Sequence, residues 1–287
     1  MNAPGGSAQE TRQTSRREAA SESRGMVASV WANRRLISQL TWRDIQRRYR
    51  NSALGILWSL VTPLLMLATY TFVFSSVMKA RWSSDATEVS DYAIVMFAGM
   101  LTHGFFAECA TRAPLLILEH ASYVKKMLFP LDSLACVVAG SALFSFGIGL
   151  FVLIVAVAVR FGEIHLTLIY FPVVLAPLLL YSVAACWFLS ALGVFLRDVG
   201  HAVGVVVTLM LFLSPTFYPI SAVPTDVRPW LALNPLTDLM EQLRNIVIWG
   251  KSVDYMVLLP HWILASLLAV AGHAWFERAR RAFADVV

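Results

Sequence analysis

The stretch at residues 41–78, TWRDIQRRYRNSALGILWSLVTPLLMLATYTFVFSSVM, decides which fold this chain is expected to adopt. Its first third has the spacing of a short amphipathic helix, in which Thr41 caps the start and Asp44 completes a capping box. Apolar side chains fall on one face of that helix and arginines on another, which is typical of a membrane surface. No charged residue follows Asn51 until Lys79, which is ample for a transmembrane helix of about 20 residues. We therefore predict a helix along a bilayer surface and then one through it.

The composition indicates a membrane protein. The chain has 287 residues, of which 58% are hydrophobic and 14% are charged, and its mean hydropathy is +0.65. These values are too apolar for a soluble protein of this length. The net charge of +5 does not indicate nucleic-acid binding, because the basic residues cluster beside apolar segments. Cys109, Cys136 and Cys186 lie in apolar sequence without metal-ligand spacing, so we predict buried packing residues, with neither a disulfide framework nor a metal site.

The chain divides into three parts. Residues 1–25 are polar and lack the apolar core of a signal peptide, so we predict a disordered cytoplasmic tail. Residues 26–53 form an amphipathic interface segment, and residues 54–287 a transmembrane domain. Its expected spans are 54–78, 92–111, 133–159, 166–196, 199–220 and 255–276. Six spans place both termini on one side, and the excess of Lys and Arg on that side predicts that it is the cytoplasm.

Two connections are longer than simple turns. The predicted cytoplasmic connection, 112–132, has a short helix after Pro114, then a basic pair and a proline. The predicted outer connection, 221–254, contains a helix with Asn234 as its cap and Gly250 as its stop. One face of this helix is an apolar stripe of Leu236, Leu239, Met240, Leu243 and Val247. We expect such a helix to rest on the membrane or to close an opening.

No pattern of catalytic residues occurs in the sequence. The sequence Gly-Lys-Ser at 250–252 resembles the end of a phosphate-binding loop, but the first glycine of that motif is missing. Energy for transport would therefore come from a partner or from an ion gradient. For an ion-coupled carrier, Glu108 is the best intramembrane candidate, yet Arg112 can neutralise it at i+4. His103 fits a packed neutral histidine better than a proton relay.

The first span combines aromatic rings with hydroxyl groups. On an ideal helix, one side holds Trp58, Thr62, Thr69, Phe72 and Ser76. Such a surface can stack on sugar rings and exchange hydrogen bonds with sugar hydroxyls, and ordinary helix packing explains it equally well. In the fifth span, Gly200 and Gly204 form a GxxxG pair that permits close helix contact.

Five motifs in order carry a resemblance to a known family. They are RDIQRRYRNSALGILWSLVTPLL at 43–65, LEHASYVKKMLFPLD at 118–132, FLRDVG at 195–200, SPTFYPISAVP at 214–224 and NPLTDLMEQLRNIVIWG at 234–250. With these motifs the chain resembles the membrane permease of ABC-2 type polysaccharide exporters, which serve O-antigen, capsule and teichoic-acid export. The resemblance implies an all-α inner-membrane protein with six transmembrane helices, an N-terminal interface helix, a cytoplasmic coupling helix and outer gate helices. It also implies a homodimer, two copies of a separate ATPase subunit that binds the ATP, and a glycan linked to undecaprenyl pyrophosphate.

The resemblance and the residue chemistry together suggest three sites. Arginine binds phosphate oxygens in a planar fork, so the predicted lipid-pyrophosphate site consists of Arg43, Arg47, Arg48 and Arg50. Alternatively, these arginines only fix topology and bind anionic membrane lipids. The predicted ATPase contact consists of Glu119, Tyr123, Lys125 and Lys126, with a solvated loop as the alternative. The predicted outer gate consists of Pro215, Tyr218, Pro219, Leu239 and Leu243, with a passive helix in the outer leaflet as the alternative.

Other functions fit the same predicted fold. A drug or lipid exporter is the nearest alternative. An ion-coupled carrier has less support, because the sequence shows no internal repeat and no convincing mid-membrane ionisable group. A membrane scaffold without a transport role is the remaining alternative.

Overall fold

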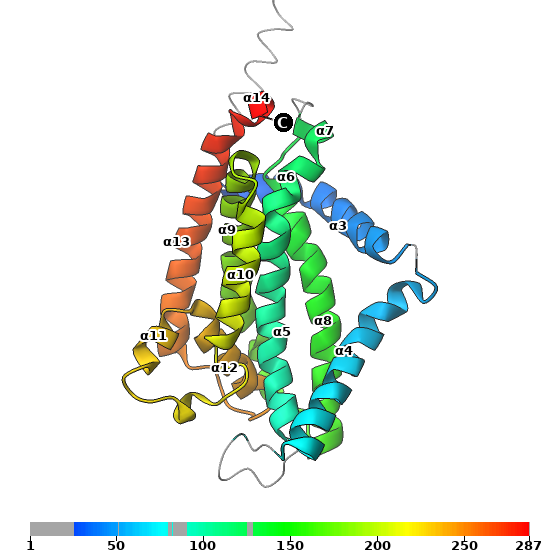
Figure 1. Cartoon of the computed structure of the whole chain (residues 1–287), viewed down its shortest axis with the longest axis vertical. Coiled ribbons are helices and arrows are strands. Elements are labelled where there is room, and N and C mark those ends of the chain that lie inside the picture. The colour runs from blue at the N-terminus through cyan, green and yellow to red at the C-terminus, as the bar shows by residue number, and fades with distance from the viewer. Residues whose placement is uncertain (1–25, 51, 80–81, 83–90, 125–128, 287) are drawn as a thin grey trace, which may run out of the picture.

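A computed structural model describes residues 26–50, 52–79, 82, 91–124 and 129–286 (Figure 1). The predicted tail at 1–25 lies outside these residues. Within the described ranges the chain is helical and contains no strand. The helices are α2 (Met26–Ala32), α3 (Arg34–Tyr49), η1 (Gly55–Leu57), α4 (Trp58–Tyr70), η2 (Thr71–Val77), α5 (Asp91–Arg112), η3 (Ala113–Leu115), α6 (Leu116–Glu119), α7 (Ala121–Val124), α8 (Ser133–Phe161), η4 (Leu166–Tyr170), α9 (Phe171–Phe195), α10 (Val199–Phe212), η5 (Ile220–Ala222), α11 (Arg228–Ala232), α12 (Pro235–Val247), α13 (Tyr255–Arg280) and α14 (Phe283–Val286).

Five helical segments of the described chain are long and apolar enough to cross a membrane. They are Gly55–Val77, Tyr92–Glu119, Ser133–Phe161, Leu166–Phe195 and Tyr255–Arg280. They correspond to five of the six expected spans, which confirms an all-α membrane fold.

The fifth expected span, 199–220, is shorter than predicted. Its helix α10 has 14 residues and ends at Phe212, giving about 21 Å of helix against a hydrocarbon core of about 30 Å. Turns and bends follow at 213–218, which include Pro215, and Pro219 comes next in an extended conformation. Proline lacks an N–H donor and clashes with the preceding turn of a helix, which explains why the apolar run continues while the helix does not.

The predicted cap at Thr41 is wrong. Helix α3 begins at Arg34, seven residues earlier, and Asn33 precedes it without a side-chain cap. Residues 35–40 contain no glycine or proline, so nothing in them stops the helix from starting upstream. Thr41 therefore lies inside the helix, where its buried hydroxyl has no hydrogen-bond partner among the described residues. Asp44 is directed instead toward Arg112.

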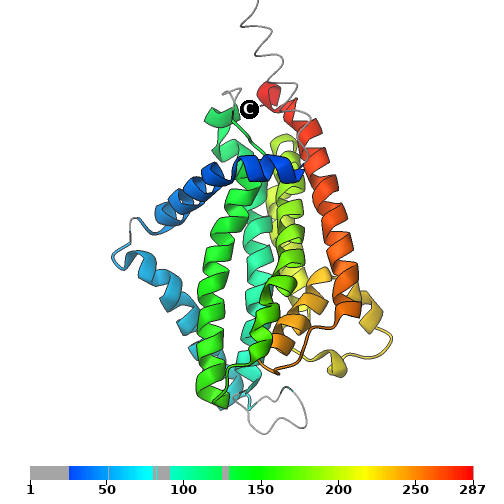
Figure 2. The ribbon, with the colours of Figure 1, turned by 180° about the vertical axis from the view of Figure 1, so that it is seen from behind.

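The bundle has a buried centre and a separated first span. Helices α9 and α13 pack along each other, α5 packs against α8 and α9, and Trp187 of α9 is almost completely buried in this core. In the most apolar stretch of the span Tyr92–Glu119, which contains α5, 67% of the residues are buried. In the corresponding stretch of Gly55–Val77, which contains α4, none is buried. Figures 1 and 2 show α3 lying across the bundle at the end where α7 and α14 lie, while α4 slants away from the other helices. One side of α4 packs on α8 and α5, and its opposite side lacks a covering partner within the described chain.

The helix expected at 235–249 forms, but its apolar face is turned inward. The Asn234 Oδ1 atom accepts a hydrogen bond from the Leu236 backbone N–H at 3.1 Å, which confirms the predicted cap. Helix α12 packs against α5 and α9, and its whole apolar stripe is buried in the main core. The stripe therefore faces protein, and α12 does not rest on a membrane surface through it. Gly250 adopts a φ of +61°, as a left-handed position after a helix favours.

The predicted packing residues behave as ordinary core groups. Cys109 and Cys186 are buried free thiols, whereas Cys136 is only half-buried, and the Cys186 Sγ atom lies 3.4 Å from the Cys109 carbonyl oxygen. His103 is buried, with its Nε2 atom 3.0 Å from the carbonyl oxygen of Val207 in α10. These contacts agree with their interpretation as packing residues.

Candidate functional site

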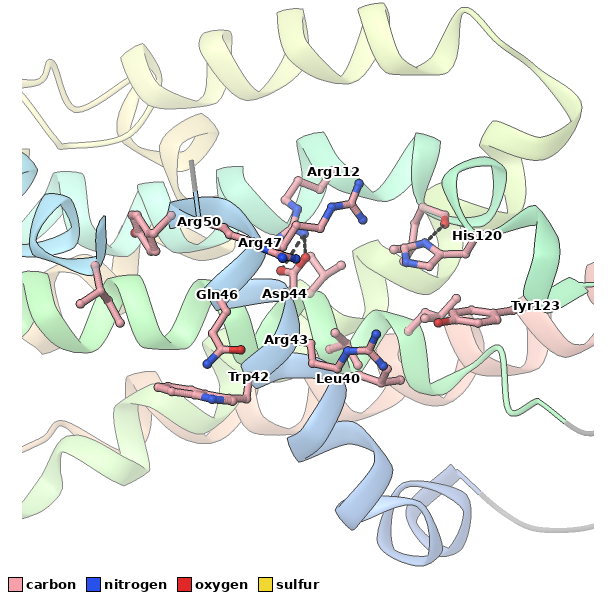
Figure 3. Close-up of a pocket in the computed structure, with 16 residues that line it drawn as sticks. Leu40, Trp42, Arg43, Asp44, Gln46, Arg47, Arg50, Arg112, His120 and Tyr123 are labelled. Carbon is pink, nitrogen blue, oxygen red and sulfur yellow. Dashed lines mark hydrogen bonds and ion pairs between the residues drawn. The ribbon is translucent and has the colours of Figure 1, made fainter. Parts of the chain in front are cut away.

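A cavity of about 700 Å³ opens between α3, the end of α5, the segment 113–124 and the start of α8. We call this space the arginine cavity, and Figure 3 shows its lining side chains. Helix α3 contributes Arg43 and Arg47, the residue that follows it is Arg50, and the segment 113–124 contributes His120 and Tyr123. Their spacing along α3 explains the grouping, because residues three and four apart lie on one face of a helix.

An ion pair joins the two walls of the arginine cavity. The Arg112 Nη2 atom lies 2.9 Å and 2.8 Å from the two carboxylate oxygens of Asp44. Burial alone would raise the pKa of the Asp44 carboxyl, but Arg112 and hydrogen bonding with Ser141 more than offset this and lower it. Asp44 is therefore ionised near neutral pH and holds α3 against the end of α5.

Arg48 is separated from the other three arginines of the predicted site. Its guanidinium forms an ion pair with Glu108 and donates a hydrogen bond to the Ser145 hydroxyl at 3.2 Å. It lines a different cavity of about 350 Å³ between α3, α4, α5 and α8. Glu108 also lies 3.7 Å from Arg112, so the predicted neutralisation of Glu108 at i+4 is present and is shared with Arg48.

The predicted ATPase contact is only partly within the described residues. Lys125 and Lys126 lie outside them. Glu119 ends α6 and is exposed, whereas Tyr123 stacks on Phe129 with ring centroids 4.3 Å apart. The two short helices and Tyr123 thus form a folded segment that carries both an exposed acidic group and one wall of the arginine cavity.

The predicted channel-lining residues all lie on the exposed surface of the first span. Trp58 is 39% exposed and Phe72 is 63% exposed. The Thr62 hydroxyl donates to the Trp58 carbonyl at 2.8 Å, so part of its hydrogen-bonding capacity is used by its own helix. From Thr71 the backbone continues as a π-helix. The ideal-helix spacing used to predict the stripe therefore ends at Tyr70, and Ser76 is rotated relative to Trp58.

The turn after α10 is held by side chains from two other helices. Asn234 donates its Nδ2 to the Ser214 hydroxyl at 2.7 Å, and the Tyr92 hydroxyl donates to the Phe217 carbonyl. Of the predicted gate residues, Pro215 is buried in this turn, and Tyr218 follows it and lines an apolar cavity of about 810 Å³. Leu239 and Leu243 lie in the protein core, so substituting them would disturb packing and would not test a lid.

Arg244 of α12 is a buried residue that none of the sequence motifs indicates. It is fully buried, its Nε donates to the Val95 carbonyl at 3.0 Å and its Nη2 to the Thr216 carbonyl at 3.4 Å. Glu241 lies 2.6 Å from its Nη1, and its guanidinium carbon lies 4.5 Å from the ring centroid of Trp82. Burial lowers the pKa of Arg244 and Glu241 partly offsets this, but a guanidinium stays charged in proteins.

A local signal for Arg244 exists in the sequence. It follows Leu236 and Met240 at intervals of four residues, which places it on the apolar face of α12. A lone arginine within such a stripe is a candidate for a buried group that bonds backbone carbonyls.

Comparisons with known proteins agree with this fold. The family described as ABC-2 type transporter matches residues 35–248. Over 267 residues the chain is 28% identical to the O-antigen export system permease protein RfbA of Myxococcus xanthus, covering 91% of this chain and 99% of that protein. Over 259 residues it is 24% identical to a protein of the same name from Klebsiella pneumoniae, covering 88% and 95% of the two chains. Because the family match spans most of the sequence, the chain belongs to the ABC-2 type transporter family.

Proposed function

We propose that this chain is the permease half of an ATP-driven exporter that moves a lipid-pyrophosphate-linked polysaccharide across the bacterial inner membrane. Its family makes it a transporter subunit and not itself an enzyme. The relatives that match it over nearly their whole length are named O-antigen export permeases, which supports a polysaccharide cargo. In this proposal two permeases form a dimer, two ATPase subunits bind the ATP, and both termini lie in the cytoplasm. The permease itself needs no cofactor.

The arginine cavity is the observation that carries this proposal. Arg43, Arg47 and Arg50 line one space at the end of the bundle where both described termini lie. Among the described residues, none of these three has an ion-pair partner within 4.0 Å, unlike Arg48 and Arg112. A pyrophosphate group carries at least two negative charges, and unpaired guanidinium groups are suited to bind its oxygens. We therefore assign the lipid-pyrophosphate head group to this cavity and leave Arg48 in a structural ion pair.

The double variant Arg43→Gln with Arg47→Gln is expected to weaken binding of undecaprenyl pyrophosphate roughly 100-fold. It removes two charge-assisted hydrogen bonds, each of which contributes about 1.5 kcal/mol. Binding is measured by titration of the permease in nanodiscs made of zwitterionic lipid. The matched control is Arg34→Gln with Arg35→Gln, which removes the same charge from exposed positions on the same helix. Equal weakening in both variants would mean that the arginines act only by general attraction to the negative charge of the lipid ligand.

The exposed surface of α4 supports the proposed dimer with a central channel. Six helices enclose too little space for a hydrated sugar chain, so a second copy has to complete the path.

We expect a cysteine at Thr62 or Thr69 to react with a membrane-impermeant maleimide in the assembled transporter. A cysteine at Leu267, which is 61% exposed on α13, serves as the lipid-facing control and should stay unlabelled. If all three positions remain unlabelled, α4 faces lipid and does not line the path.

A further inference from the structure

His120 connects the arginine cavity to the segment that leads toward the predicted ATPase contact. It lies between α6 and α7 and lines the cavity opposite the arginines of α3 (Figure 3). Its ring is stacked near Tyr123, with centroids 5.6 Å apart. The cavity is therefore lined on one side by α3, which carries arginines of the proposed head-group site, and on the other by the segment 113–124, which leads toward the predicted ATPase contact.

The hydrogen bonding of His120 defines which ring nitrogen is available. The Nδ1 atom lies 2.8 Å from the Leu116 carbonyl oxygen. A carbonyl oxygen can only accept, so Nδ1 carries the proton in this contact. Among the described residues Nε2 has no hydrogen-bond partner within 3.5 Å. In the neutral ring Nε2 can accept a proton or a hydrogen bond, and in the charged ring it donates.

We propose that His120, as the imidazolium cation, donates a hydrogen bond from Nε2–H to the pyrophosphate head group, together with Arg43, Arg47 and Arg50. The head group then bridges α3 and the segment 113–124, so that occupancy of the cavity changes the position of the segment that contacts the ATPase. This inference rests on the proposed function and adds to it a means by which loaded substrate stimulates ATP hydrolysis.

The geometry of the segment 113–124 suits such a role. Its first residues are fixed, because Gly193 of α9 packs directly against the backbone of Pro114. Beyond that anchor, α6 and α7 have four residues each, and helices this short have little stability of their own. Helix α6 is held against α9 and has Leu116 and Ile117 buried in the core, so a ligand that draws His120 toward the arginines can shift α7 while α6 and α9 stay in place.

The competing explanation is that His120 only supports the local structure. Its Nδ1–H group satisfies a carbonyl at the end of α6, and its ring stacks near Tyr123. Two substitutions separate these roles. His120→Phe keeps an aromatic ring but removes both nitrogens, whereas His120→Lys removes the ring but supplies an ammonium group that binds phosphate.

The experiment measures undecaprenyl pyrophosphate binding to the permease–ATPase complex in nanodiscs, and the ratio of stimulated to basal ATP hydrolysis. Inorganic pyrophosphate and undecaprenyl phosphate serve as separate probes, to distinguish recognition of the pyrophosphate from that of the lipid. For His120→Phe we expect about tenfold weaker binding, because one charge-assisted hydrogen bond is lost. We also expect a ratio of stimulated to basal ATP hydrolysis near one. His120→Lys should keep both within a few-fold of the parent.

Three results would overturn the proposal in different ways. If His120→Phe behaves like the parent and His120→Lys loses function, the ring acts by stacking alone. If both variants bind and respond like the parent while Arg43→Gln with Arg47→Gln loses binding, the proposed function stands and the role of His120 does not. If the arginine variant also binds and responds like the parent, the proposed function itself fails.

Discussion

Replacing Arg244 by methionine is expected to lower the free energy of unfolding by about 3–5 kcal/mol, the range found when one partner of a buried ion pair is removed. Methionine has a similar reach but no donors. It would leave the carbonyl groups of Val95 and Thr216 without the hydrogen bonds that they accept from Arg244. Thermal unfolding in detergent should show a decrease in the midpoint on the order of 10 °C.

The same variant is expected to make the predicted outer gate leak ions. Arg244 anchors the turn after α10 to α5 and α12, and this turn contains Pro215, a residue of the predicted gate. Without the anchor, the turn is held mainly by Asn234 and Tyr92. Ion leakage from vesicles that contain the permease, measured without ATP, should therefore rise above that of the parent.

Arg228→Met is the matched control for Arg244→Met. Arg228 of α11 also donates to two backbone carbonyls, those of Val223 and Ser221, but it is exposed to solvent. Water can replace its hydrogen bonds, so the expected loss of stability is below about 1 kcal/mol. The loss of stability in Arg244→Lys should lie between those of the two methionine variants. An ammonium group cannot donate to both carbonyls and also stack on Trp82 as a guanidinium does. Equal stability and equal tightness of Arg244→Met and Arg228→Met would contradict the anchoring role.

The membrane helices could be predicted from the sequence because their signal is local. A long apolar run bounded by charges determines a span without reference to the rest of the chain. The cap at Asn234 was predictable for the same reason, since its hydrogen bond reaches only Leu236. The false cap at Thr41 shows the limit of local motifs. Threonine and aspartate three residues apart also fit inside a helix, and here a tertiary partner, Arg112, binds the aspartate.

The site could be predicted only as a group of residue types. The arginines in and after α3 were recognisable from their number and position. The sequence did not indicate that Arg48 lies in a different cavity from the other three. Arg48 pairs with a residue 60 positions away, and no periodicity within α3 indicates that choice. His120 gave no signal because its place in the arginine cavity depends on how the segment 113–124 folds back toward α3.

Close helix contacts were likewise not predictable from motif alone. In the predicted GxxxG pair, a Cβ atom added at Gly204 would meet nothing within 4 Å in the described chain, and one at Gly200 would meet only Pro114 at 3.9 Å. The tightest approach occurs at Gly193, which no motif marks. There an added Cβ atom would lie 2.1 Å from the Pro114 carbonyl oxygen.

Gly193→Ala is therefore expected to displace the start of the segment 113–124. Both sides of this contact are backbone, so α9 or η3 has to move, at a cost of about 3 kcal/mol or more. Because α9 is packed into the core along α13, the movement should fall on η3 and pass to His120 and Tyr123.

Two measurements check the effect of Gly193→Ala. Its thermal midpoint should fall, and the ATPase should co-purify in lower yield because the segment that leads to the predicted contact is shifted. Gly147→Ala in α8 is the matched control, since the added Cβ atom meets nothing within 4 Å. That variant should be neutral or more stable by up to about 1 kcal/mol, because alanine favours a helix over glycine. If the two variants show the same stability and the same yield of complex, Gly193 does not fix the segment and the anchor assumed for His120 is absent.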